Sequence, residues 1–316
     1  MNTNSIYEQF EGYDRYDLPV GIVRVTAGEG GDVYLIDCGG KTAMYDCGMA
    51  YCGGKMIEYT KKQLKEWGYD SVDYVFVSHS HYDHIGALPY IIKEWPDVKV
   101  CGAEKAAKVF RSEGAKALMV KLGTAAKKAY QPEEEAGFDI TADGMRVDII
   151  LKDGDSINIG SKTITAYETP GHTDCSMSFM LLPEKILFIS ESTGVLRRPD
   201  LVSSAILKSF DDSIASALKC KSLKAKSLIG SHYGHIPEFF TDEYFDRYIE
   251  TASSEQRIFA GMYKDGASME EMMKKYDEMH WTKQRAAAQP REAFTENAGH
   301  IIRSYINKYI SDTEER

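Results

Sequence analysis

Three histidines and one aspartate fall within six consecutive residues of this chain: His79, His81, Asp83 and His84. They follow an apolar run, residues 74–77, whose β-branched and aromatic side chains indicate a buried strand. Side chains two residues apart at an extended strand end point the same way, so His79 and His81 can reach one metal ion together. Asp83 and His84 follow where the chain turns into a helix. We expect their side chains to lie beside the metal position that His79 and His81 share. Neutral imidazole and carboxylate groups suit a divalent metal that keeps positions open for water.

A single histidine at the end of a strand is more often a hydrogen-bonded core or rim residue than a metal ligand. Four candidate ligands in six positions favour the metal site over this structural interpretation. Imidazoles packed so closely would hinder one another's protonation and would add little to a core. The cluster therefore predicts a metal site at the carboxyl end of this strand.

Three later segments carry further candidate ligands. His172 stands in Thr-Pro-Gly-His-Thr, where Pro170 and Gly171 predict a turn that holds the imidazole at the end of a strand. Glu191 ends the apolar run Ile-Leu-Phe-Ile-Ser-Glu, and His232 follows Ile-Gly-Ser. In this order, and over roughly residues 20 to 240, the four segments resemble the motifs of the metallo-β-lactamase-fold hydrolases.

The resemblance implies a centre of two divalent metal ions, with zinc as the first choice and iron or manganese as alternatives. Its ligands would be seven side chains: His79, His81, Asp83, His84, His172, Glu191 and His232. By family correspondence the first ion takes His79, His81 and His172. The second takes Asp83, His84 and His232. Within the superfamily, the pattern is closest to the glyoxalase II-like thioesterases.

Glu191 departs from the family pattern, because most members with two metals use aspartate as the bridging acid. Ser190 likewise stands where a glycine is common. Glutamate is also a hard oxygen ligand, but its extra methylene must be accommodated. The alternative is that Glu191 misses one metal, and that the second ion binds loosely or not at all.

The family chemistry implies a hydroxide made from metal-bound water at neutral pH. Asp83 would orient this nucleophile as well as bind metal, and Tyr233 is a candidate for contacting substrate or stabilising an oxyanion. Arg197 and Arg198 follow the bridging acid; their guanidinium groups suit a substrate carboxylate or phosphate, with plain surface charge as the equal alternative. The predicted function is hydrolysis of an ester, thioester or lactone of a small molecule. The alternatives are a phosphodiesterase acting on a small nucleotide or RNA, and a non-hydrolytic di-iron redox or sensor protein.

Composition is that of an ordinary globular protein: 316 residues, 43% apolar and 27% charged. The net charge of −10 argues against broad binding to nucleic acid or to an anionic membrane. No secretory signal pattern and no run of about 18 apolar residues is visible, so a membrane span is not expected. Six dispersed cysteines predict reduced thiols and a cytoplasmic location.

Short apolar segments separated by Gly and Asp predict strands in two groups. The first group covers residues 21–25, 33–36, 42–45, 74–77 and 98–101, and the second covers 146–151, 156–159, 162–168, 176–182 and 185–190. Amphipathic spacing predicts helices at 56–67 and 85–93 and a long helical segment at 103–131, broken near Gly114 and Gly123.

Two strand-rich halves with helices suit the fold that the resemblance implies, an α/β protein of αββα type: a four-layer sandwich of two mixed β-sheets. We assign residues 1–240 to this catalytic domain and 241–316 to a helical C-terminal extension or cap. The apolar stripe of the last helix is also a candidate contact in a homo-oligomer.

Overall fold

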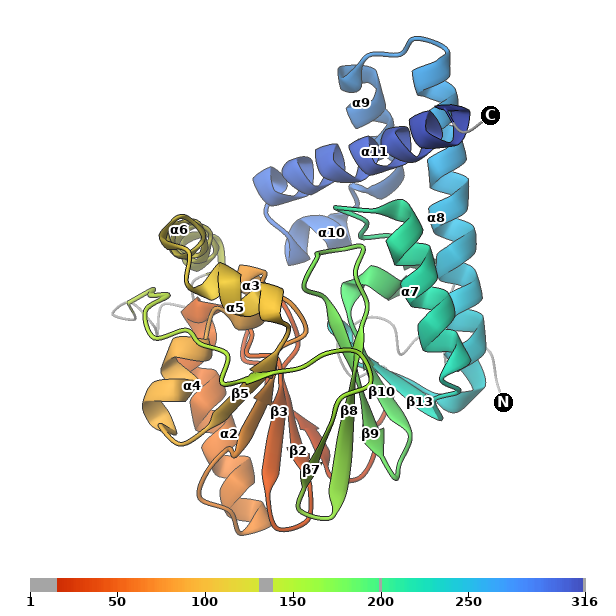
Figure 1. Ribbon diagram of the computed structural model, residues 1–316. Helices are drawn as coiled ribbons and strands as arrows, with labels where there is room; N and C mark the ends of the chain where they lie inside the picture. Colours follow the sequence, from red (N-terminus) through yellow and green to blue (C-terminus); the bar gives the residue numbers. More distant parts are fainter. Residues whose placement is uncertain (1–15, 131–138, 199–200, 315–316) are drawn as a thin grey trace.

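The computed structural model describes residues 16–130, 139–198 and 201–314. Two six-stranded sheets pack face to face, and helices cover the outer face of each (Figure 1). The predicted αββα sandwich is therefore confirmed.

The first sheet is mixed. Its strands lie in chain order: β1 (Ile22–Arg24), β2 (Tyr34–Asp37), β3 (Thr42–Tyr45), β4 (Tyr74–Phe76), β5 (Lys99–Gly102) and β6 (Ile149–Ile150). The first three strands are antiparallel, and β3 to β6 are parallel. Parallel neighbours need a crossover between them, so helices must connect β3, β4 and β5.

The second sheet is also mixed, in the order β14 (His235–Ile236), β13 (Ser227–Gly230), β10 (Ile186–Ile189), β9 (Met177–Leu182), β8 (Lys162–Glu168) and β7 (Ser156–Ile159). Only β10 and β13 pair in parallel; the other neighbours are antiparallel. A separate two-stranded sheet joins β11 (Val195–Arg198) to β12 (Leu201–Ser203).

Helices form the outer layers. On the first sheet these are α2 (Gly53–Trp67) and α4 (Leu88–Glu94), and on the second they are α7 (Phe210–Ser222) and α8 (Thr241–Lys264) (Figure 1). Three helices, α3 (Tyr82–Ile85), α5 (Glu104–Phe110) and α6 (Glu113–Tyr130), lie at one edge of the first sheet. The chain continues through α9 (Met269–His280), α10 (Lys283–Ala288) and α11 (Arg291–Glu314).

Aromatic side chains fill the space between the two sheets. Tyr45 and Phe188 lie 5.0 Å apart between ring centroids, and Phe76 and Phe179 lie 5.2 Å apart. The Tyr45 hydroxyl also donates to the carbonyl of Ile189, at 3.1 Å, and so links β3 to β10. This contact fixes the two sheets against each other directly beneath the edge that carries the predicted ligands.

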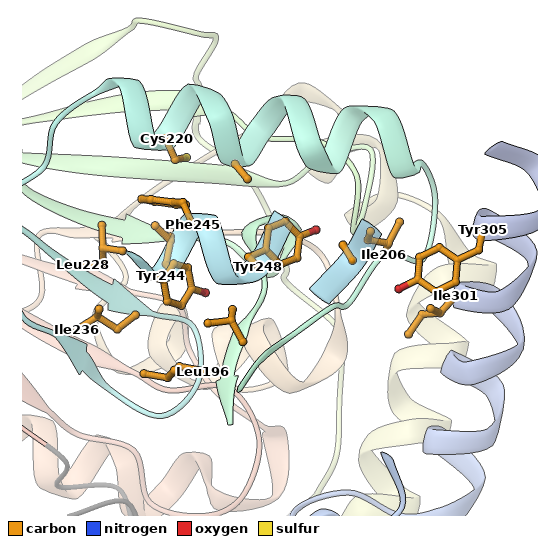
Figure 2. Close-up of a cluster of buried hydrophobic side chains, with 14 of the residues drawn as sticks. Leu196, Ile206, Cys220, Leu228, Ile236, Tyr244, Phe245, Tyr248, Ile301 and Tyr305 are labelled. Atoms are coloured by element: carbon orange, nitrogen blue, oxygen red, sulfur yellow. The ribbon is translucent and has the colours of Figure 1, made fainter. Parts of the chain in front are cut away.

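The C-terminal helices share a core with the second sheet. Figure 2 shows Tyr244 and Tyr248 of α8 among Leu228 of β13 and Leu196 of β11, with Tyr305 of α11 further along the same cluster. The apolar face of α11 is thus buried within its own chain. α8 begins at the predicted domain boundary, residue 241. The division into a domain and a cap, and an oligomer contact through these helices, stay predictions.

Several predicted elements need correction. The helix expected at 85–93 is two helices, α3 and α4, because Pro89 in the first turn of α4 has no N–H to continue α3. The segment expected at 103–131 breaks at residues 111–112 and continues through Gly123. Gly123 lies against Ile140: an added Cβ would come within 2.9 Å of its Cγ2. The helix α7 and the strands β11 and β12 were not predicted.

All six cysteines lie buried as free thiols. Within the described ranges, no helix is long and apolar enough to cross a membrane.

Candidate metal centre

The loop after β4 carries four of the predicted ligands. His79 lies just beyond the strand, His81 is the N-cap of α3, and Asp83 and His84 lie in its first turn. Asp46, at the end of β3, anchors this loop. Its Oδ1 accepts a hydrogen bond from the backbone N–H of Ser78 at 2.7 Å. Strand, turn and helix therefore present four polar side chains at one sheet edge.

The first group of candidate ligand atoms contains three imidazole nitrogens. Nδ1 of His81 lies 3.1 Å from Nε2 of His79 and 2.9 Å from Nε2 of His172. A tetrahedral zinc ion bound at about 2.0–2.1 Å keeps its ligand atoms roughly 3.3 Å apart. The three nitrogens therefore lie close to the spacing that one ion requires.

The second group contains Asp83, His84 and His232. Oδ2 of Asp83 lies 3.4 Å from Nε2 of His84 and 3.8 Å from Nε2 of His232. His232 comes from the turn after β13, in the second sheet, whereas the other two residues belong to α3. The edge of each sheet contributes to this group.

Glu191 lies between the two groups, at the start of the short 3-10 helix that follows β10. Its Oε2 is 2.7 Å from Nε2 of His172 and 3.9 Å from Nε2 of His79. Its Oε1 is 2.7 Å from Nε2 of His232. The two oxygens of one carboxylate thus face different groups, and the longer glutamate side chain reaches both.

Hydrogen bonds behind four imidazoles set their orientation. Nδ1 of His79 lies 2.9 Å from Ser78 Oγ, and Nδ1 of His84 lies 3.0 Å from Asp46 Oδ2. Nδ1 of His172 lies 2.6 Å from the carbonyl of Ala205, and Nδ1 of His232 lies 3.0 Å from that of Gly30. In each ring this contact leaves Nε2 directed toward the two groups, as in metal-binding histidines.

Burial and crowding keep two of the imidazoles neutral. Burial lowers the pKa of His79 well below its usual value, and the neighbouring imidazoles of His84, His81 and His172 lower it further. Burial, followed by the charge of His172, lowers the pKa of His81 to about 3. Both rings therefore offer lone pairs at neutral pH, which is the form that binds metal.

The two carboxylates are held in the charged form. Burial alone would raise the pKa of Asp83, but the charges of His84 and His232 outweigh it and lower the pKa to about 2. In Glu191, His172 and His232 similarly outweigh burial and hold the pKa well below its usual value. The site therefore combines two neutral imidazoles, His79 and His81, with ionised carboxylates. Burial alone would lower the pKa of His84, but the charge of Asp83, followed by the hydrogen bond to Asp46, outweighs it and raises the pKa well above its usual value.

These residues fit a divalent metal. Nε2 of His84 is fully buried and has no hydrogen-bond partner among the residues that the structure describes, although it faces Asp83 and His232. An orphaned buried nitrogen costs free energy unless something binds it. A metal ion coordinated by this group would satisfy it, and the nitrogen and oxygen donors are those that zinc, iron and manganese accept.

Tyr233, the predicted substrate contact, follows His232 directly and has a backbone φ of 63°. Its hydroxyl accepts a hydrogen bond from Nη1 of Arg197 at 2.6 Å, and the guanidinium carbon of Arg197 lies 5.2 Å from the ring centroid. The ring lies 6.0 Å from that of His232. Tyr233 therefore lines the rim of the centre. The side chain of Arg198 lies outside the described part of the chain.

Asp46 is the functional residue that sequence reasoning missed. The fully buried carboxylate of Asp46 supports both Ser78 and His84. Its backbone φ of 54° is rare for a residue with a side chain, and could not be anticipated from the sequence.

The family model of the metallo-beta-lactamase superfamily matches residues 26–232. Coenzyme F420H(2) oxidase of Methanothermobacter marburgensis is 26% identical over 165 residues, 52% of this chain and 34% of that protein. Hydroxyacylglutathione hydrolase of Rhodopseudomonas palustris is 33% identical over 66 residues, 21% of this chain and 26% of that protein. The chain thus spans about a third and a quarter of the length of these two curated relatives.

Among solved structures, the metallo-beta-lactamase family protein TTHA1429 of Thermus thermophilus superposes with a TM-score of 0.64. The match covers 92% of this chain and 95% of that one at 17% identity, which shows a shared fold. The family model covers well over half of the chain, and the two mixed sheets agree with it. The chain therefore belongs to the metallo-beta-lactamase superfamily.

Proposed function

We propose that this protein is a metal-dependent hydrolase that acts on an ester, thioester or lactone of a small molecule. The observation that carries the proposal is the carboxylate of Glu191, whose oxygens each lie 2.7 Å from an imidazole of a different group. A side chain placed in this way suits a bridge between two divalent ions. Such ions lower the pKa of water toward about 7 and polarise the carbonyl or phosphoryl oxygen of a substrate.

Residues of this chain would position the attacking water and the oxygen of the developing oxyanion. Asp83, ionised and close to both His84 and His232, is placed to accept a hydrogen bond from an attacking water and to fix its direction. Tyr233 can donate its O–H to the oxygen of a developing oxyanion, because its phenol oxygen already accepts from Arg197. A hydrogen bond accepted from a cation makes the phenol a stronger donor. No side-chain nucleophile is needed.

One observation favours a redox function instead: the curated relative that matches this chain over 165 residues is an oxidase. The donor set supports hydrolysis, since five imidazoles and two carboxylates form a nitrogen-rich centre of the kind that suits zinc. Elemental analysis of the purified protein, combined with an oxygen-consumption assay, separates these two proposals. Iron with oxygen uptake would favour the redox function.

The test of the hydrolase proposal is a panel of thioester, lactone, ester and phosphodiester substrates assayed with metal-loaded protein. We expect turnover of at least one carbonyl substrate, and its loss in His84→Gln. His235→Gln is the matched control, because this imidazole lies three residues from His232 but contacts the carbonyl of Asp17 instead of the metal centre. Turnover of the phosphodiester alone would contradict the proposed carbonyl substrates and would favour a phosphodiesterase.

A further inference from the structure

The carbonyl of Ala205 determines which nitrogen of His172 is free to bind metal. It lies 2.6 Å from Nδ1 of His172. A carbonyl oxygen can only accept a hydrogen bond, so Nδ1 carries the proton and Nε2 of the neutral ring keeps its lone pair. Nε2 is the atom that lies 2.9 Å from Nδ1 of His81 in the first group. The position of Ala205 therefore sets both the tautomer and the direction of one candidate ligand.

Ala205 lies in the segment that connects β12 to α7. Near α7, the backbone N–H groups of Lys208 and Ser209 donate to the carbonyl of Gly171, at 3.0 and 3.2 Å. These bonds hold that end of the segment against the turn that carries His172. The end next to β12, which includes Ala205, is in contact with α11, the last helix of the C-terminal extension.

Tyr305 of α11 makes the first of these contacts. Its hydroxyl donates to Oε2 of Glu255 on α8 at 2.7 Å and lies 2.5 Å from Oγ of Ser204. A phenol has one proton, and because Glu255 receives it, Ser204 must donate to the oxygen of Tyr305. Burial, followed by the charge of Glu255, raises the pKa of Tyr305 well above its usual value, so the phenol keeps its proton. Ser204, the residue before Ala205, is thus tied to two helices of the extension.

Ile206, the residue after Ala205, also contacts α11. Its side chain is fully buried in the same cluster as Ile301 and Tyr305, and Figure 2 shows these three side chains close together. The hydroxyl of Ser304 lies 3.1 Å from the carbonyl of Ile206 and 2.8 Å from that of Ile301, so its one proton is shared between them. Both neighbours of Ala205 are therefore held against the last helix.

Glu255 makes the position of Tyr305 costly to change. This carboxyl group is 4% exposed, and its Oε1 lies 3.3 Å from Nε2 of His280 on α9, whose side chain is 7% exposed. A buried carboxyl oxygen that loses its hydrogen-bond donor is unfavourable, so Glu255 retains the Tyr305 hydroxyl. The chain of hydrogen bonds from Glu255 through Tyr305 to Ser204 therefore links the packing of the C-terminal helices to the segment that carries Ala205.

We propose that Tyr305 is a positioning residue for the metal centre: through Ser204 it holds the carbonyl of Ala205 where that carbonyl orients His172. The helical extension is thereby assigned a role in metal binding at the first group. Loss of a partner that contacts a ligand directly lowers metal affinity about 10- to 100-fold. Tyr305 acts through further residues, so its loss should have a smaller effect. This inference uses the metal centre of the proposed function but not its substrate class.

The first test measures zinc affinity by competition with a chelator. Tyr305→Phe removes only the hydroxyl and keeps the ring in its cluster, and we expect zinc to bind about 3- to 10-fold more weakly. Ser204→Ala removes the other end of the same hydrogen bond and should cause a similar loss. The double variant should lose clearly less than the product of the two single losses, because both hydroxyls serve one contact.

The second test observes His172 directly, by nuclear magnetic resonance of zinc-loaded protein that is isotope-labelled at the histidine nitrogens. The proton on Nδ1 of His172, identified by its loss in His172→Gln, should exchange with water faster in Tyr305→Phe than in wild type. The proton on Nδ1 of His232, which lies 3.0 Å from the carbonyl of Gly30, is the internal reference and should not change. A general loss of stability would accelerate both protons.

Two control variants separate positioning from stability. Tyr309→Phe makes the same change one turn later on α11, where the ring packs against Tyr263 with 6.2 Å between centroids, and it should behave as wild type. Ser268→Ala removes the N-cap of α9, where the hydroxyl accepts from the backbone N–H of Glu271 at 3.3 Å. It should make the extension less stable in thermal unfolding but leave zinc affinity unchanged.

The proposal stands if zinc binds more weakly and the His172 proton alone exchanges faster. Unchanged zinc affinity, unchanged exchange at His172 or equal acceleration at His232 would overturn it, as would a loss of zinc affinity in Ser268→Ala as large as in Tyr305→Phe. If Tyr305→Phe does not fold, Ser204→Ala decides between these outcomes. If the zinc effects appear but no substrate is turned over, the hydrolase proposal fails and the positioning role remains.

Discussion

Oδ2 of Asp46 lies 3.0 Å from Nδ1 of His84, behind the imidazole whose Nε2 faces the second group of candidate ligands. The same oxygen accepts from the Ser78 hydroxyl at 2.7 Å, and that hydroxyl lies 2.9 Å from Nδ1 of His79. A single carboxylate at the end of β3 therefore orients one imidazole in each group, His84 directly and His79 through Ser78. Such outer partners determine the tautomer and basicity of a ligand.

Replacing Asp46 by asparagine should weaken metal binding at both positions. The amide keeps the shape but removes the negative charge that supports His84, so we expect a loss of metal affinity of about 10- to 100-fold. Competition with a chelator measures it. Asp37→Asn, at the partly buried end of β2, is a control that should bind metal normally. Unchanged affinity in Asp46→Asn would show that the backbone alone orients the imidazoles.

Glu191 should determine how many ions the protein holds. Glu191→Ala removes both oxygens that face the two groups, and we expect the bound metal to fall from two ions to one or none per chain. Glu191→Asp shortens the side chain by one methylene and should retain the first ion while binding the second more weakly. Elemental analysis of dialysed protein gives the stoichiometry. Two ions retained in Glu191→Ala would exclude Glu191 from the centre.

The metal-free protein should lose stability in acid partly through His81. Its pKa is about 3 in the folded chain, against about 6.5 when unfolded. The unfolded chain therefore binds more protons between these values, so the free energy of unfolding decreases as pH falls through this window. In His81→Asn this contribution is absent. Denaturant unfolding of both chelated proteins at pH 7 and pH 5 should show the larger acid-induced loss in wild type, and equal losses would contradict it.

Gly171 should be essential for the placement of His172. Its φ is 131°, and an added Cβ would lie 2.5 Å from Cα of Ser213 in α7. Gly171→Ala must therefore strain the backbone or displace α7, which we expect to cost about 1–3 kcal/mol of stability and to weaken metal binding at the first group. Gly154→Ala is a control with a similarly positive φ of 85°, where no heavy atom of the described residues lies within 4 Å of the added Cβ. Combined unfolding and metal-affinity measurements separate strain from the steric conflict.

The sequence predicted the sandwich and the candidate centre for a definite physical reason. Buried strands appear in the sequence as continuous apolar runs. The change from apolar to polar side chains between Val77 and His79 therefore marks the end of a strand. Turn residues such as Pro170 and Gly171 likewise locate His172. The side chains that these patterns placed at strand ends do converge in the structure.

Other features depend on distant contacts that no local pattern carries. Asp46 supports His84 across 38 positions in the chain, through a backbone conformation that glycine would usually adopt. Gly123 looked like a helix break, but close packing against Ile140 explains it. The position of α10 depends on how the C-terminal helices pack against one another, and this helix is too short to show amphipathic periodicity.

The division of candidate ligands between the two sheets has a consequence for biosynthesis. His79, His81, Asp83 and His84 emerge from the ribosome early, while His172, Glu191 and His232 follow over the next 150 or so positions. A nascent chain that has folded only its first sheet presents four of the seven candidate ligands. This partial set would discriminate poorly between divalent cations. The complete set of candidate ligands therefore exists only once β13 has paired with β10 and has brought His232 to the other six residues.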